Sequence, residues 1–235
     1  MSFKIVVMSC DKNQDLWQPF HECMEKYWKD HPEIIYSTET IQNPYYKTIC
    51  INLPIEKWTR RVCETVKDLP CKHILLMVDD LFLRDYVNNS LMWKAANAVS
   101  GNYAALNLEY SFDPEDHFIG YLDRNPVYPI LVRNSQGKYL LSCMCQMWQK
   151  RAILDLFNVD MNPWEFEKSK AKHWWFLISK YGNFINWGKP RDDWQFGVIK
   201  GKWAHECKEF FDKEGIEIDY SIRGFIEKGQ HRWLK

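Results

Sequence analysis

HILLMVDD, residues 73–80, joins a short apolar run to a pair of adjacent aspartates. The run at residues 73–78 has the length and composition of a strand that is buried on both faces. Ahead of it, side chains recur at steps of three and four and predict a helix with one buried face that ends before Pro70; they are Trp58, Val62, Thr65, Val66 and Leu69. This order of elements places Asp79 and Asp80 at the carboxyl end of the strand.

The same alternation continues on either side of this stretch. Apolar runs predict strands at residues 4–8, 34–36, 48–52, 103–108 and 138–145. Periodic or capped segments predict helices at 16–28, 87–99, 146–157, from Asn162 onward, and at 202–214, where Gly215 ends the last one. Alternating strands and helices predict a single α/β domain over residues 1–235, with a mostly parallel central sheet flanked by helices.

Basic and acidic side chains balance, with 31 Lys and Arg against 31 Asp and Glu. Nucleic-acid-binding proteins normally carry excess positive charge, so the balance argues against a nucleic-acid partner. The longest aliphatic run, residues 74–78, is too short for a transmembrane helix, and no targeting segment opens the chain, so we expect a cytoplasmic protein. The eight cysteines include no CxxC pair, which argues against zinc and favours reduced thiols.

Adjacent carboxylates at the end of an apolar strand repel each other and lose solvation. At about 4 Å and an effective dielectric near 20, the repulsion is about 4 kcal/mol. A divalent cation, Mn²⁺ or Mg²⁺, would offset it, because such ions bind one or two carboxylates and complete their shell with substrate phosphates and water. The alternative is a turn in which Asp79 and Asp80 only cap the following helix.

Ligands of parallel sheets bind beyond the carboxyl ends of the strands. In this sequence the rule singles out two places, Asp79-Asp80 and the segment Ser9-Cys10-Asp11 that follows the first predicted strand. We therefore expect the two segments to lie near a bound nucleotide.

These segments resemble GT-A-type glycosyltransferases of surface-polysaccharide (capsule and lipopolysaccharide) biosynthesis. The resemblance rests on WTRRVCETV at 58–66, which leads to HILLMVDDLFL at 73–83, and on KIVVMSCD at 4–11. It implies a GT-A-like, Rossmann-like domain, with a nucleotide-sugar-binding half at about 1–110 and an acceptor-binding half at about 111–235. It also implies metal ligation by Asp80 and Asp79 and donor-nucleotide contacts from Ser9, Asp11, Thr38, Arg61 and Asp79.

An inverting sugar transfer needs a carboxylate that takes the proton of the acceptor hydroxyl. The segment NPWEFE, residues 162–167, resembles the acidic motif that carries this base in the same family, which makes Glu165 and Glu167 the catalytic candidates. The alternative for Glu165 is a capping box with Asn162. Glu167 could equally be a solvated side chain, and Trp164 would either stack on an acceptor sugar or fix the helix to the core.

Basic residues of the second half have weaker assignments. Lys202 and Arg223 are candidates for donor phosphates and His205 for a late metal ligand, each with a structural alternative. A lysine series predicts a solvated helix face, or contact with anionic lipid head groups beside a lipid-linked acceptor; its members are Lys168, Lys170 and Lys172.

The sequence thus predicts a glycosyltransferase that moves a sugar from a nucleoside diphosphate donor, a UDP-sugar, to a glycan or lipid-linked acceptor with help from a divalent metal. It would work in the cytoplasm, at the cytosolic face of a membrane if the acceptor is lipid-linked. One alternative is a sugar nucleotidyltransferase, although the segment SCDKNQD at 9–15 lacks the glycine-rich loop expected there. The other is a non-catalytic carbohydrate-binding domain that uses the many aromatic side chains.

Overall fold

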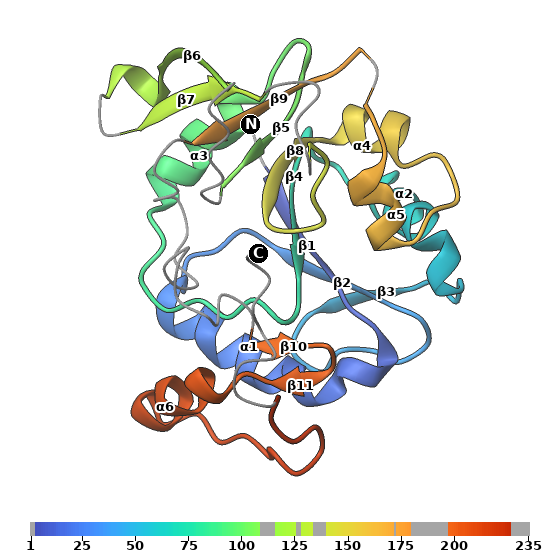
Figure 1. The fold of residues 1–235 in the computed structure, drawn as a ribbon, viewed down its shortest axis with the longest axis vertical. Coiled ribbons are helices and arrows are strands. Elements are labelled where there is room, and N and C mark those ends of the chain that lie inside the picture. Colours follow the sequence, from blue (N-terminus) through green and yellow to red (C-terminus); the bar gives the residue numbers. More distant parts are fainter. Residues whose placement is uncertain are drawn as a thin grey trace.

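The computed structural model describes residues 3–108, 116–125, 128–133, 140–171, 173–179 and 197–226. In this part of the chain a nine-stranded sheet is flanked by helices on both faces (Figure 1). The sheet strands are β1 Phe3–Met8, β2 Ile34–Thr38, β3 Lys47–Cys50, β4 His73–Val78, β5 Tyr103–Asn107, β6 His117–Tyr121, β7 Pro129–Val132, β8 Gln146–Gln149 and β9 Trp175–Ser179. The prediction of an α/β fold with helices flanking a large central sheet is confirmed.

Six α-helices and one small hairpin complete the described elements. The helices are α1 Gln14–Tyr27, α2 Trp58–Val66, α3 Asn89–Ala98, α4 Lys150–Leu156, α5 Pro163–Lys168 and α6 His205–Glu214. The hairpin pairs β10 Val198–Ile199 with β11 Lys202–Trp203, and short 3-10 turns lie at Asp11–Asn13, Ile55–Lys57 and Leu122–Arg124.

The strand order is β3-β2-β1-β4-β8-β5-β9-β7-β6. The first four of these strands are parallel to one another. From β1 the chain moves outward to β2 and β3, then returns to place β4 on the other side of β1. β8 runs antiparallel between β4 and β5, and β7 is also reversed, so the sheet is mixed, although most strands point the same way.

Alternate residues of the central strands feed two hydrophobic cores on opposite faces of the sheet. Phe3, Ile5 and Val7 pack in the core that includes α1, α3 and α6, whereas Val6 and Met8 pack in the core beneath α2, α4 and α5. Figure 1 shows α2, α4 and α5 together on one side of the sheet. The chain places β2 on one side of β1 and later places β4 on the other, so the strand order reverses between β1 and β4. Right-handed crossovers in these opposite directions put their helices on opposite faces of the sheet. Ligands of such sheets bind at this reversal.

Two predicted elements of the second half are wrong. Residues 140–145 form bends and irregular chain rather than a strand, and 138–139 lie outside the described residues. The predicted helix at 146–157 begins as β8, with Met147 in one core and Trp148 in the other, and becomes helical only at Lys150. Consecutive apolar residues suit a strand buried on both faces as well as a buried helix, so periodicity could not separate them.

The predicted helix at 202–214 begins only at His205, because Lys202–Trp203 forms β11. The two residues between β10 and β11, Lys200 and Gly201, both have positive φ angles of 52° and 79°, which is the geometry of a tight hairpin turn. The predicted end is correct: Gly215 adopts a left-handed conformation with φ 71° directly after α6.

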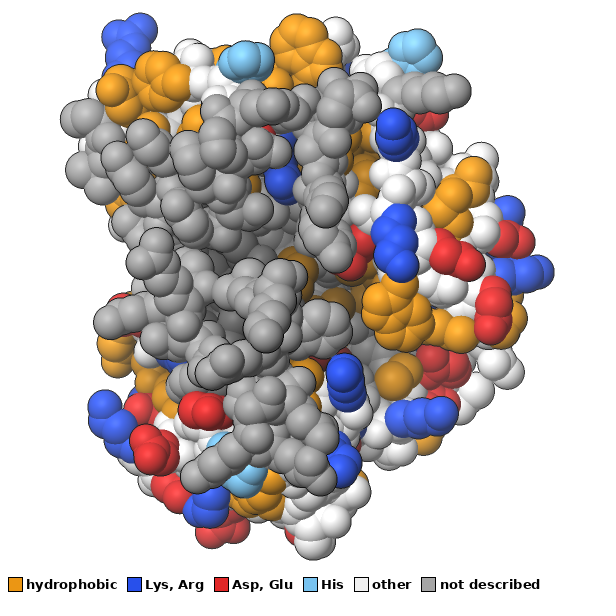
Figure 2. All heavy atoms as spheres, viewed as in Figure 1, with side chains coloured by type: hydrophobic (Ala, Val, Ile, Leu, Met, Phe, Trp, Pro, Cys, Tyr) orange, Lys and Arg blue, Asp and Glu red, His pale blue; other side chains and the backbone are white. Residues whose placement is uncertain are grey.

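The surface carries no large charged patch on the coloured part of the face in Figure 2, where acidic and basic side chains lie close together. This mixing agrees with the equal numbers of acidic and basic residues. All eight cysteines are free thiols, and most are buried. Among the described helices, none has the length and apolar character needed to cross a membrane.

Candidate functional site

The carboxyl ends of β1 and β4 are joined by hydrogen bonds to the Asp79 carboxyl group. Ser9 Oγ donates to Asp79 Oδ2 at 2.5 Å, and Asn13 Nδ2 donates to Asp79 Oδ1 at 3.0 Å. Trp17 Nε1, from the first turn of α1, donates to Ser9 Oγ at 2.8 Å. Asp79 is 3% exposed, so both of its oxygens are satisfied inside the protein. Ser9 and Asp79, predicted to share a site, do come together.

Asp80 differs from its neighbour because the residue as a whole is only partly buried, although its carboxyl group is desolvated. Among the described residues, no side chain donates a hydrogen bond to this carboxylate. Its backbone carbonyl is held, since Gly197 N–H donates to it at 3.0 Å. The carboxylate has a hydrogen bond from its own backbone, so Asp80 is the member of the pair that can accept a ligand without losing a contact to another described side chain.

The pair is electrostatically strained. Burial raises the pKa of Asp79 to about 7, with a further contribution from the Asp80 charge, while hydrogen bonds from Ser9 and Asn13 act in the opposite direction. Burial also raises the pKa of Asp80 to about 6, against the nearby positive charge of Arg223. Desolvation thus outweighs the local donors, and a bound cation would favour the ionised form of both groups.

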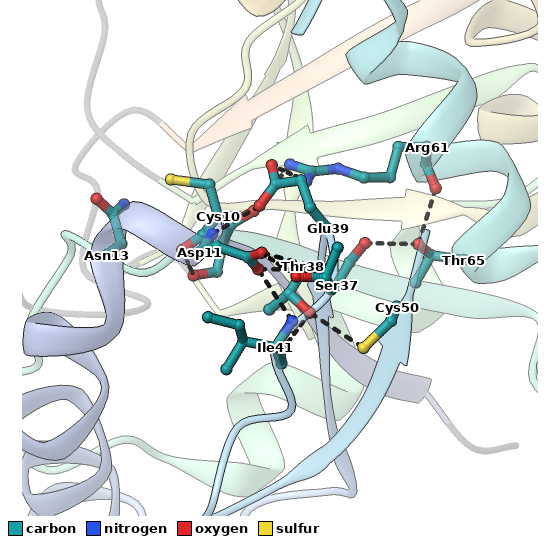
Figure 3. Close-up of polar contacts among 12 residues, drawn as sticks. Cys10, Asp11, Asn13, Ser37, Thr38, Glu39, Ile41, Cys50, Arg61 and Thr65 are labelled. Carbon is teal, nitrogen blue, oxygen red and sulfur yellow. Dashed lines mark hydrogen bonds and ion pairs between the residues drawn. The ribbon is translucent and has the colours of Figure 1, made fainter. Parts of the chain in front are cut away.

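Asp11 ties the loop after β1 to the loop after β2 (Figure 3). Its carboxylate accepts hydrogen bonds from Thr40 N–H and Oγ1, at 3.1 and 2.6 Å, and from Ile41 N–H at 3.2 Å. Partial burial acts to raise the pKa of Asp11, but these hydrogen bonds together lower it. In return, Glu39 accepts the backbone N–H of Asp11 at 2.6 Å. Asp11 therefore joins the two loops by hydrogen bonds, and its contact with a nucleotide stays a prediction.

Arg61 and Thr38 point inward. Arg61 is 4% exposed; its Nη1 donates to Glu39 Oε1 at 2.5 Å and its Nη2 to the Ser9 carbonyl at 2.8 Å. Thr38 is fully buried and donates to the Ile41 carbonyl at 2.7 Å. Figure 3 shows the guanidinium lying against Glu39. Their predicted contacts with a nucleotide stay predictions, and in this structure both side chains support the loops from beneath.

Glu165 and Glu167 lie on α5, which packs Phe166 into the core on the α2 side of the sheet; Glu165 is exposed and Glu167 is partly buried. Glu165 closes the capping box that was its alternative: its N–H donates to Asn162 Oδ1 at 2.9 Å, and its Oε2 accepts Asn162 N–H at 3.1 Å. Glu167 accepts Cys143 N–H at 2.9 Å, and burial raises the pKa of Glu167. Among the described residues, neither carboxylate has a hydrogen bond or ion pair to the Ser9–Asp79 cluster.

Two of the basic candidates of the second half, Arg223 and His205, have internal partners. Arg223 donates to both oxygens of Asp15, at 2.6 and 2.7 Å. The His205 ring stacks on Phe225 at 4.8 Å between centroids, which is a packing role. Lys202 is exposed on β11, and Lys172 lies outside the described residues.

Sequence reasoning missed several residues that shape the site: Asn13, Asp15, Trp17, Glu39 and Gly197. Asn13 and Asp15 belong to the polar run that follows β1, so a weak signal existed. Trp17 lies in the predicted helix at 16–28, but helical periodicity does not indicate that its indole donates to Ser9. Gly197 and Glu39 are distant in sequence from the residues they contact, and no local pattern reveals such pairs.

A cation would fit Asp80 best. Within the described ranges, no group of three or more His, Cys, Asp and Glu side chains is arranged to hold a metal ion. One available carboxylate, supported by a second, is nevertheless a sufficient protein contribution for Mg²⁺ or Mn²⁺ when substrate oxygens and water supply the other ligands. The Asp80 carboxylate, which accepts no hydrogen bond from a side chain of the described residues, meets that requirement.

Comparisons with known proteins give only distant likenesses. No protein-family model matches the sequence, and no curated protein matches it. Among solved structures, the bifunctional IspDF from Campylobacter jejuni aligns at 8% identity and TM-score 0.44, over 77% of this chain and 51% of that one. A cytidylyltransferase from Leptospira borgpetersenii aligns at 8% identity and TM-score 0.39, over 71% and 68% of the two chains.

A third similar structure, residues 1–349 of TarS from S. aureus, aligns at 12% identity and TM-score 0.39, over 75% of this chain and 60% of that one. The chain therefore spans about half the length of the IspDF chain and three fifths of this TarS chain.

Proposed function

We propose that this chain is a metal-dependent transferase that moves a sugar from a nucleoside diphosphate donor, a UDP-sugar, to a glycan or lipid-linked acceptor. One observation carries the proposal. At the reversal of strand order, no side chain of the described residues donates a hydrogen bond to the Asp80 carboxylate, while both oxygens of the adjacent Asp79 are held from the end of β1. A structural turn would not need two desolvated carboxyl groups at the ligand-binding end of a sheet.

In this proposal the two aspartates have different tasks. Asp80 binds the cation, and Asp79 fixes the geometry of the pair through Ser9 and Asn13. A divalent cation bound there would neutralise charge on the departing diphosphate. The loops held together by Asp11, Glu39 and Arg61 form the side of the site that receives the nucleoside. A preformed loop of this kind lowers the entropic cost of binding.

For the base that takes the acceptor proton, the geometry favours Glu167 over Glu165. Glu165 is occupied in capping its own helix. Glu167 is not, and its burial raises its pKa, which is the direction that suits proton transfer near neutral pH.

The proposal is tested by thermal shift with a panel of nucleoside diphosphates, with and without Mn²⁺. We expect one diphosphate, UDP, to raise the melting temperature only when Mn²⁺ is present, since a ligand at 100 times its Kd stabilises the native state by about 2.7 kcal/mol. Asp80→Asn should remove this shift while the ligand-free protein stays folded. Asp160→Asn, which alters an exposed ion pair with Arg60, is the matched control and should keep it. A shift that persists without metal, or in Asp80→Asn, contradicts the proposal.

Product analysis separates the rival classes. A glycosyltransferase incubated with its donor slowly releases nucleoside diphosphate and free sugar. A nucleotidyltransferase instead transfers the nucleotidyl group of a nucleoside triphosphate to a sugar phosphate and releases pyrophosphate. A carbohydrate-binding domain does neither and binds glycans without nucleotide.

A further inference from the structure

Arg223 connects a late part of the chain to the start of α1. It lies in the turn after α6, and its Nε and Nη2 donate to the two oxygens of Asp15 at 2.6 and 2.7 Å. The two side chains are only 11% and 12% exposed. This paired geometry is available to arginine but not to lysine, because the planar guanidinium presents parallel N–H groups to a carboxylate.

The same guanidinium also sets the orientation of Asn13. Arg223 Nη2 donates to Asn13 Oδ1 at 2.9 Å, and Asn13 Nδ2 donates to Asp79 Oδ1 at 3.0 Å. A flipped amide would place its NH₂ group against the guanidinium and its oxygen against the Asp79 carboxyl group, so both contacts would be lost. Arg223 therefore fixes which face of Asn13 meets Asp79.

Arg223 is anchored by the segment that also holds Asp80. Gly197 N–H donates to the Asp80 carbonyl, and Ala204 N–H donates to the Gly197 carbonyl at 2.9 Å. The chain that follows Arg223 is bonded to β11: Trp203 N–H donates to the Gly224 carbonyl at 3.0 Å, and Ile226 N–H donates to the Trp203 carbonyl at 2.9 Å. One hydrogen-bonded unit thus reaches Asp80 directly and Asp79 through Asn13.

We propose that Arg223 is a positioning residue of the acid pair, acting through Asn13 to hold Asp79 in the orientation that supports a cation on Asp80. This role rests on the proposed function. It differs from direct contact with donor phosphates, and also from a purely electrostatic effect of the arginine charge. Each of these three roles predicts different changes in the free energy of unfolding and in the Kd for Mn²⁺ when Arg223 and Asn13 are replaced.

The first experiment needs no ligand. Urea unfolding is measured for Arg223→Gln, for Asp79→Ala, which removes the acceptor of Asn13, and for the double variant. If Arg223 acts through Asn13, the two changes are non-additive, and they become additive in an Asn13→Ala background. Additivity in both backgrounds overturns the link, whether or not the protein binds a nucleotide.

The second experiment measures Mn²⁺ retention in the presence of UDP by electron paramagnetic resonance. Loss of a residue that orients a metal ligand typically costs 10–100-fold in metal affinity. We expect a rise of at least tenfold in Kd for Arg223→Gln and for Asn13→Ala, no further rise in the double variant, and only partial rescue by Arg223→Lys. Arg60→Gln, which breaks an exposed arginine–carboxylate pair elsewhere, is the control and should match the wild type.

The outcomes are separable. Full affinity in Arg223→Lys means that charge alone matters, and multiplied losses in the double variant mean that Arg223 touches the ligand independently; either result overturns the proposal. If the wild type fails to retain Mn²⁺ with UDP, or Asp80→Asn still retains it, the proposed function fails instead, and the ligand-free cycle alone decides whether Arg223 orients Asn13 toward Asp79.

Discussion

Asp79 shows how one residue can be fully hydrogen-bonded and still be costly to ionise. Each of its oxygens has a donor, from Ser9 or Asn13, yet the group is 3% exposed and stands beside Asp80. Loss of hydration and the neighbouring charge together outweigh the two donors, so the pKa of Asp79 rises to about 7. Without a cation, the folded protein therefore holds Asp79 protonated up to a higher pH than an ordinary aspartate.

This cost predicts an unusual response to Asp79→Asn. The folded pKa is about 7 and the ordinary value is 3.8, so between these limits the folded state binds more protons than the unfolded state, and stability falls as pH rises. Asparagine keeps the shape and the Asn13 contact but cannot ionise. The metal-free variant should be more stable than the wild type at pH 8, with about 1.4 kcal/mol at stake for each pKa unit of the shift.

The measurement is urea unfolding of both proteins from pH 4 to pH 8 in the presence of a chelator. The difference in free energy of unfolding should grow through this window and then level off above pH 7. Parallel profiles for the two proteins would show that Asp79 is not strained.

Sequence could locate the acid pair but not the state of its neighbours. An apolar strand followed by two aspartates predicts where those residues lie, because the strand fixes the edge of the sheet. Arg61 was predicted to contact the ligand. In the structure Arg61 is only 4% exposed and is paired with Glu39. A buried, paired arginine and a free phosphate-binding arginine have the same local sequence, and only the tertiary structure separates them.

Among the elements, the β10–β11 hairpin depends on a close approach between Gly197 and Phe82. A Cβ atom on Gly197 would lie 2.2 Å from the Phe82 ring. Gly197→Ala should therefore cost about 1–3 kcal/mol, typical of an overpacked core, and should also weaken Mn²⁺ binding because Gly197 N–H holds the Asp80 carbonyl. Urea unfolding and Mn²⁺ titration measure the two effects.

Phe82→Leu in the same background supplies the control, since it removes the ring that the new methyl group meets. The double variant should recover part of the stability lost in Gly197→Ala. If Gly197→Ala unfolds at the same urea concentration as the wild type, the backbone adjusts to the added methyl group and the close approach does not contribute to stability.

Helix α5 offers a comparison between its two glutamates. Gln can close a capping box as Glu does, so Glu165→Gln should leave stability and turnover almost unchanged. Glu167→Gln keeps the acceptor for Cys143 N–H but cannot take a proton, and it should lower kcat by about 100-fold or more if Glu167 is the base. Steady-state kinetics with the donor identified by the screen decide between them, and an equal loss in both variants would exclude both assignments.

Element boundaries followed the strength of the sequence signals. Asn162 with Pro163 and Glu165 predicted the start of α5, because capping chemistry is local. β8 was missed because its four residues are consecutive and buried, so neither period is visible. The hairpin turn at Lys200-Gly201 was overlooked although glycine at a positive φ is a usual signal for it.

At the scale of the whole molecule, the last described segment, residues 197–226, belongs to the same core as the first strand, β1. Trp203, Phe211 and Ile226 pack in one cluster with Ile5 and Val7. Trp203→Ala, which empties a fully buried site, should cost about 3–5 kcal/mol and lower the unfolding midpoint of the entire described sheet. Far-UV circular dichroism and tryptophan fluorescence should shift together, and Trp203→Phe should lose much less. Two separate transitions would show that the late segment unfolds alone.

The strand order was the least predictable feature of the molecule. Alternating patterns predicted that strands and helices form an α/β sheet, which is confirmed. They could not predict that β8 lies between β4 and β5, because periodicity reports which face of a residue is buried and carries no information on which strand is its neighbour.

The late arrival of β8 has a consequence for biosynthesis. As the ribosome extends the chain, β4 can pair with β1 early, but its other edge stays open until Gln149 has emerged. During that interval HILLMV offers unsatisfied backbone groups to other nascent chains, which is the usual starting point of aggregation. Yield in a cell should therefore depend on chaperone supply and translation speed more than the stability of the finished protein suggests.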